Sequence, residues 1–92
     1  MTQAQAELFA ARVLGWLAED HARIGAFLTT TGTAPGALRN VLDDPVFLLG
    51  VLDFLMSDEA LLIDCCTGLE TPVETPAAAR AALPGGAEVH WT

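Results

Sequence analysis

The sequence contains no lysine, and its only cations are four arginines, Arg12, Arg23, Arg39 and Arg80. Twelve Asp and Glu residues outnumber them, so the formal net charge is −8. A surface that binds phosphates needs clustered Lys and Arg, because the release of counterions provides most of the non-specific affinity. Four scattered arginines in an acidic chain argue against nucleic acid or an anionic membrane surface as a partner.

Long apolar runs are also missing. The longest, residues 46–56, is interrupted by Asp53 and is far shorter than the ~18–20 residues that span a bilayer. The first five residues are polar and run directly into a helical pattern, without the charged and then apolar segments of a leader. We therefore expect neither a membrane span nor a signal peptide.

Cysteine is scarce, with only Cys65 and Cys66, which are adjacent. In a helix two neighbouring side chains point roughly 100° apart, so a bridge between them would be strained. The pair is not a disulfide framework, and a reduced, cytoplasmic compartment is the simplest expectation.

The 92 residues of the chain suffice for one hydrophobic core and leave no room for a second domain. Hydrophobic residues make up 52% and charged residues only 17%, below the usual value of about 25%. Either the core is unusually apolar or some apolar surface is left for a partner. We expect one helical domain over residues 1–84 and a loosely ordered tail over residues 85–92.

Capping and stop residues divide the chain into short helices, and no alternating strand pattern appears. Counted with their capping and stop residues, the expected segments are 2–19, 20–32, 33–42, 44–56, 57–68 and 75–83. The fold class predicted is all-α, a compact single-domain bundle of five or six short helices. Helices this short need packing to be stable.

The central element of this bundle is expected to be the helix Pro45–Met56. Asp44 as N-cap and Pro45 at the first helical position make a clear helix start. The helix is apolar nearly all round, which is typical of an element at the centre of a fold or in an interface. If Phe47 and Phe54 are buried, replacing either by Ala should cost ~3–5 kcal/mol.

Several stretches resemble a small, all-helical domain family of unknown function that is typical of α-proteobacteria. They are Trp16-Leu17-Ala18-Glu19-Asp20, Ile24-Gly25-Ala26-Phe27-Leu28, Thr31-Gly32, Asp44-Pro45-Val46-Phe47-Leu48, Val51-Leu52-Asp53-Phe54-Leu55 and Asp58-Glu59-Ala60-Leu61-Leu62. The resemblance covers roughly Leu8 to Leu83 and implies a helical, cytoplasmic protein with no assigned activity or catalytic residues. Ile63-Asp64-Cys65-Cys66 departs from the apolar or alanine-rich pattern expected there, which weakens any family-wide role for the cysteines.

Three acidic pairs, Glu19-Asp20, Asp43-Asp44 and Asp58-Glu59, each lie where a helix is expected to begin. Carboxylates there accept backbone N–H bonds and complement the helix dipole. No Asp-x-Asp-x-Asp-Gly loop suggests calcium. We therefore predict capping rather than acid–base chemistry or metal binding.

Asp53 interrupts the apolar helix and has two interpretations. If it faced the core it would need a partner, such as Arg23 or Arg39, because an unpaired buried charge is costly. The favoured interpretation places it on a solvent-facing stripe with Leu49 and Ser57.

Cys65, Cys66, His21 and His90 are of the types that bind zinc, but adjacent cysteines lack the spacing of converging ligands. Buried cysteines that act as small hydrophobic residues are favoured. No general base or phosphate-binding glycine loop accompanies them.

A helix-turn-helix drawn through residues 21–42 is disfavoured by the acidic charge of the chain. Its second helix would offer only Arg39 and Asn40 to a DNA groove, and Asp43 and Asp44 follow directly.

The leading hypothesis is a non-enzymatic module for protein–protein interaction or self-association, with no cofactor, metal, nucleic acid or membrane partner. Its candidate interaction face is Leu48, Leu49, Leu52, Leu55 and Met56, which cannot all point into one core. The alternative is a small-molecule binder or minor enzyme with a pocket between helices near Trp16, Phe27, Phe47 and Phe54. A structural or phage-like accessory protein is a third hypothesis.

Overall fold

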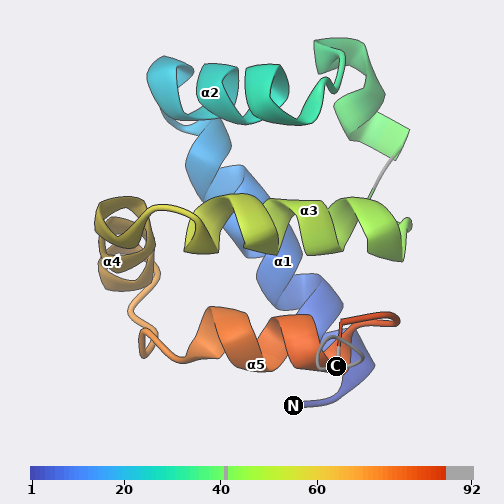
Figure 1. Ribbon diagram of the computed structural model, residues 1–92, viewed down its shortest axis with the longest axis vertical. Coiled ribbons are helices and arrows are strands. Elements are labelled where there is room, and N and C mark those ends of the chain that lie inside the picture. Colours follow the sequence, from blue (N-terminus) through green and yellow to red (C-terminus); the bar gives the residue numbers. More distant parts are fainter. Residues whose placement is uncertain (41, 87–92) are drawn as a thin grey trace.

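The structure, a computed structural model, describes residues 1–40 and 42–86, without the side chains of residues 39 and 40, and contains no strand in that part. Five α-helices and one 3-10 helix follow in the order α1 (Gln3–Ala18), α2 (His21–Thr31), η1 (Pro35–Asn40), α3 (Pro45–Met56), α4 (Glu59–Gly68) and α5 (Thr75–Ala82). The predicted all-α class is confirmed (Figure 1). Of the predicted loose tail, residues 87–92 lie outside the described part, whereas Gly86 is buried and its N–H donates to the Leu83 carbonyl.

Side-chain caps begin four of the helices. Asp20 accepts hydrogen bonds from the backbone N–H groups of Ala22 and Arg23, and these bonds lower the pKa of its carboxyl group. Asp44 and Asp58 cap α3 and α4 in the same way. The capping role predicted for these three carboxylates is confirmed. Thr2 forms a capping box for α1.

The third segment and the turn after α4 add details that the sequence did not predict. The third segment is a 3-10 helix of six residues, and Val41 lies outside the described residues. Helix α4 ends at Gly68, as predicted, but the left-handed residue of the turn that follows is Glu70, with φ of 56°. The N–H of Thr71 then donates to the Cys66 carbonyl at 2.9 Å, a Schellman-type closure.

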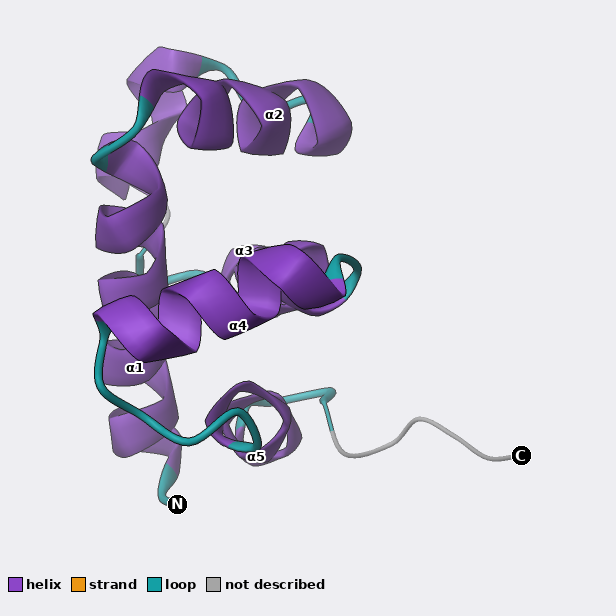
Figure 2. Ribbon diagram, turned by 90° about the vertical axis from the view of Figure 1, so that its left-hand side faces the viewer, coloured by secondary structure: helices purple, strands orange, loops and turns teal. Residues whose placement is uncertain are grey.

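Helix α1 forms a spine against which α2, α3 and α5 are stacked as three successive layers, with α4 beside α3 (Figure 2). It packs against all four other α-helices. Helix α3 also contacts each of the others, as its apolar sequence predicted, but it shares the centre of the bundle with α1. The buried residues of α1 are Ala6, Phe9, Ala10, Val13, Leu14, Trp16 and Leu17.

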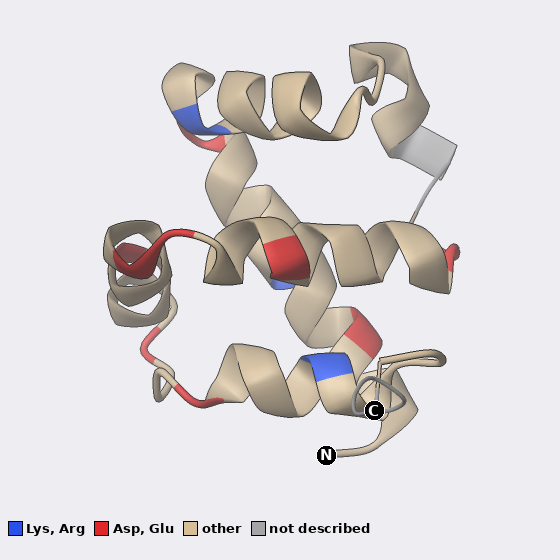
Figure 3. Ribbon diagram, in the orientation of Figure 1, with Lys and Arg blue, Asp and Glu red and all other residues tan. Residues whose placement is uncertain are grey.

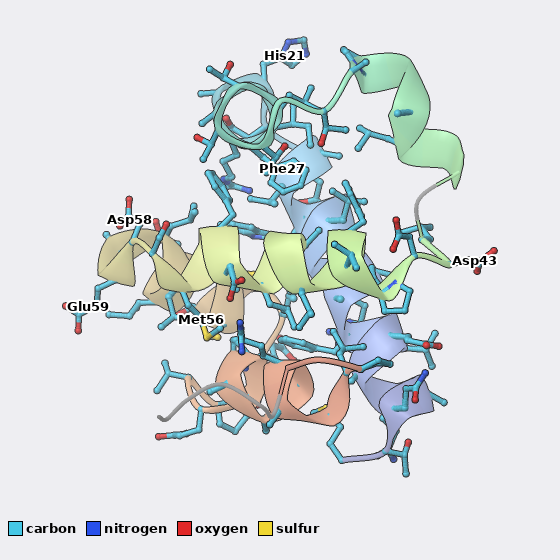
Figure 4. The ribbon with its side chains drawn as sticks, turned by 45° about the vertical axis from the view of Figure 1, so that its right-hand side comes forward. His21, Phe27, Asp43, Met56, Asp58 and Glu59 are labelled. Carbon is cyan, nitrogen blue, oxygen red and sulfur yellow. The ribbon has the colours of Figure 1, made fainter. Side chains whose placement is uncertain are left out.

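Phe27 joins α2 to α3 (Figure 4). Its ring is fully buried and meets the rings of Phe47 and Phe54 edge to face, with centroids 5.7 and 5.4 Å away. Aromatic pairs in this arrangement add about 0.5–1.5 kcal/mol each to the burial of their area. Phe47 and Phe54 themselves are half-buried, so truncating either should cost less than the value expected for a buried ring.

Trp16 joins the ends of three helices. Its indole lies against Gly68 of α4 so closely that a Cβ at residue 68 would be 2.8 Å from the Trp16 Nε1 atom. The Arg23 guanidinium lies 3.7 Å from the centroid of the indole and donates to the Trp16 carbonyl at 3.0 Å. The contact with Trp16, rather than helix termination, is therefore what requires glycine at position 68.

Phe27→Ala should lower the free energy of unfolding by about 3–5 kcal/mol, because it removes a fully buried ring and both edge-to-face contacts. Phe47→Ala should cost only about 1–2 kcal/mol, since its ring is only half-buried. Urea unfolding followed by circular dichroism measures both. Equal costs for the two variants would contradict this packing.

Gly68→Ala should destabilise the protein by about 1–3 kcal/mol, because the new methyl group collides with the Trp16 indole. Gly15→Ala is the matched control, since a Cβ there meets nothing within 4 Å. Because Gly15 lies within the last turn of α1, this control should stabilise the protein, by up to about 0.5–1 kcal/mol. Thermal unfolding of both variants should give shifts of opposite sign, and shifts of the same sign would disprove the Trp16 contact.

Candidate functional site

Three of the five residues of the predicted interaction face on α3 are not available on the surface. Leu48, Leu52 and Leu55 are 0–1% exposed and belong to the core. Leu49 and Met56 are half-buried and pack against that core. The five side chains are therefore not all buried, as expected, but the layers on both sides of α3 and the spine behind it cover the three leucines that were to form most of the face.

The four aromatic residues proposed for a pocket separate into two clusters. Trp16 packs against Gly68 and the Arg23 guanidinium, whereas Phe27 packs against Phe47 and Phe54. The rings of Phe47 and Phe54, on α3, both pack against the ring of Phe27, on α2, so these rings lie between the two helices. These aromatics therefore serve the core.

Asp53 lies on the surface, with 52% of its side chain exposed, so the favoured solvent-facing interpretation is confirmed. Its partner is Arg80 of α5, which the sequence did not suggest. The Arg80 Nη1 atom also donates to the Gly86 carbonyl at 2.8 Å. Arg80 thus ties α3 and the turn after α5 together.

Both cysteines are buried, as the sequence favoured. Burial raises the pKa of the Cys65 thiol to about 11, and burial with the charge of Glu74 raises the pKa of Cys66. A thiol that keeps its proton at neutral pH is a poor nucleophile. In the described residues no three His, Cys, Asp or Glu side chains come together as metal ligands, and His90 lies outside that part.

Three of the arginines hold the ends of helices or turns. Arg12 donates to the Leu69 carbonyl at the end of α4, at 3.1 Å, and Arg23 does the same for Trp16 near the end of α1. Arg80 holds the turn at Gly86. A guanidinium beside the carbonyl end of a helix is favourable because the dipole is negative there. These three cations are thus bound to the fold and are not gathered into a basic surface.

An acidic edge follows from this distribution of charge. Residues 40–79 contain eight Asp and Glu and no Lys or Arg. We define the α4 edge as the exposed residues Glu59, Ile63, Asp64, Glu70, Val73 and Glu74. The acidic positions of α4 and of the loop after it lie together on one side of the molecule, with no arginine among them (Figure 3). Ile63 and Val73 are 47% and 46% exposed, so this edge combines negative charge with apolar side chains.

A groove is lined by residues of the N-terminal part of the chain, most of them on α1, and by residues of the loop from α4 to α5 and the start of α5. Figure 2 shows the course of this loop from α4 to α5. The groove has a volume of about 480 Å³ and is lined by Met1, Gln5, Leu8, Phe9, Arg12, Thr71 and Thr75. Three of these residues, at positions 5, 8 and 12, form an outward stripe on α1, and their helical spacing was visible in the sequence. Thr71 and Thr75 come from more than 50 positions further along the chain, and no sequence signal pairs them with α1.

The fold is that of a small all-helical domain, and no helix in the described part is long and apolar enough to cross a membrane. Residues 3–86 match a family model described as a protein of unknown function, DUF3572. The chain therefore belongs to this family, and its resemblance to a domain family of unknown function is confirmed. No curated protein and no solved structure matches it.

The buried thiols predict a specific loss of stability at high pH. Between about pH 9 and pH 11, native Cys65 keeps a proton that the unfolded chain has lost. The unfolded state then binds fewer protons, so the free energy of unfolding must fall as the pH rises through this window. The chain has no Lys or Tyr, so no other side-chain type ordinarily titrates there.

Urea unfolding at intervals from pH 8 to pH 11 measures this loss. Cys65→Ala should reduce the slope of unfolding free energy against pH in that window. The same slope in the wild type, in Cys65→Ala and in Cys66→Ala would show that the thiols do not cause it.

Proposed function

We propose that the protein is a non-enzymatic interaction module of the bacterial cytoplasm, and that the α4 edge binds a basic, amphipathic helical segment of a partner protein. The observation that carries this proposal is the pairing of exposed Ile63 and Val73 with four carboxylates along one edge. Apolar side chains would anchor the partner, and the charge would select its sequence.

Charge complementarity determines the kind of partner. Glu59, Asp64, Glu70 and Glu74 form no ion pair within the described residues, so their field reaches solvent. Glu59 points away from the body of the molecule, at the start of α4 (Figure 4). A partner rich in Lys or Arg gains from this field, whereas an acidic segment is repelled. The gain is screened by salt, since the Debye length falls from about 30 Å at 0.01 M to about 8 Å at 0.15 M.

The chemistry of the interior supports a binding role over catalysis. Cys65 and Cys66 are buried and protonated at neutral pH, and His21 is exposed at the start of α2. Free buried thiols are compatible with the reducing cytoplasm. The module therefore acts through its surface.

The test uses an amphipathic helical peptide with Leu on one face and Lys on the other. A second peptide of the same design carries Glu in place of Lys. The Lys peptide should bind one to one and shift the NMR signals of α4 and of the loop after it, while the Glu peptide should not bind. The double variant Ile63→Ser with Val73→Ser should bind about tenfold more weakly, since each exposed anchor is worth about 1 kcal/mol or less.

Val46→Ser is the matched control, because Val46 is 76% exposed at the start of α3, outside the α4 edge. Its affinity should equal that of the wild type. Substitutions of Leu48 or Leu52 are unsuitable here, because they would measure folding rather than binding. Peptide-induced shifts spread over all helices, or equal affinity in the double variant, would contradict the proposal.

A further inference from the structure

We propose that the groove beside α1 is a binding site for a small monocarboxylate with an unbranched apolar tail. This site is separate from the α4 edge and does not depend on the interaction proposed there. Its volume of about 480 Å³ equals that of roughly 16 water molecules at about 30 Å³ each and lies in the ~300–1,000 Å³ range of ligand sites. A chain of about ten carbons is of suitable size.

The groove has apolar walls that the fold itself does not cover. Leu8 is 69% exposed and Met1 is 54% exposed, while the nearly buried ring of Phe9 contributes to the lining from the core. Leu8 lies on the outward face of α1, where a polar residue would ordinarily stand, whereas its neighbour Phe9 is buried. Exposed apolar walls beside a hollow are typical of a surface that a ligand covers.

The polar lining offers several free hydrogen-bond donors. The Gln5 side-chain carbonyl already accepts from the Thr2 N–H at 2.8 Å, which leaves the two N–H donors of its amide. Thr71 donates its hydroxyl proton to the Thr75 oxygen at 3.0 Å, which leaves the Thr75 hydroxyl as a donor. A ligand head that accepts hydrogen bonds therefore fits the groove.

The positive charge of Arg12 favours a ligand with an anionic head group. Arg12 is the only charged side chain that lines the groove. Within the described residues only its Nη2 atom has a protein partner, the Leu69 carbonyl, so the other N–H groups of the guanidinium are available. A carboxylate accepts from a guanidinium in a charge-assisted, often bidentate geometry. The groove thus prefers an anion, although the whole chain, at −8, prefers cations.

Decanoate is the probe. Decan-1-ol and decylammonium have the same tail with a neutral and a cationic head group, and serve as comparisons. Isothermal titration calorimetry should show one decanoate bound per chain, with an affinity at least about tenfold higher than that of decan-1-ol. NMR shifts should centre on Leu8, Thr71 and Thr75. Arg12→Gln should remove the preference for decanoate over decan-1-ol without abolishing the binding of decan-1-ol.

Leu8→Gln should weaken both ligands by fivefold or more, and Ile63→Gln, at an exposed position outside the groove, should weaken neither. Thermal unfolding of each variant confirms that it is folded before binding is compared. The proposal is overturned if decanoate does not bind, if decylammonium binds equally well at the same residues, or if Leu8→Gln leaves both affinities unchanged.

Discussion

The packing of α1 against every other α-helix is the constraint on which the rest of the structure depends. Each of the other helices is only 8–12 residues long, and a helix of fewer than about 12–15 residues is marginal when isolated. They are helical because α1 and α3 give each of them an apolar surface. Trp16 holds the C-terminal end of α1 in place, since its indole contacts Arg23 of α2 and Gly68 of α4.

This arrangement also explains the surface charge. Short helices produce many carbonyl ends, and Arg12, Arg23 and Arg80 donate to backbone carbonyls at such ends or at the turn after α5. In a chain with only four cations, that use leaves the carboxylates of α4 and its following loop without partners in the described residues. The acidic α4 edge is therefore a consequence of how the fold closes its helices.

Local signals in the sequence were sufficient for most helix boundaries. Asp20, Asp44 and Asp58 each combine a capping side chain with a following helical pattern, and the structure begins α2, α3 and α4 directly after them. Contacts between distant segments could not be predicted from such local signals. The burial of Leu48 and Leu52 depends on layers supplied by distant segments. The sequence marks Gly68 as the end of a helix, which it is, but does not show that the absent side chain leaves room for Trp16.

The two candidate surfaces were hidden from the sequence for the same reason. The outward stripe of α1 is visible in the sequence as helical spacing. It becomes one wall of a groove only because Thr71 of the loop and Thr75 at the start of α5 lie beside it. Leu8 and Phe9 are neighbours in sequence, yet Leu8 is 69% exposed and Phe9 only 5%. A change at Leu8 therefore alters the groove and spares the core. The same helix that organises the fold thus presents a surface that can change without loss of the fold.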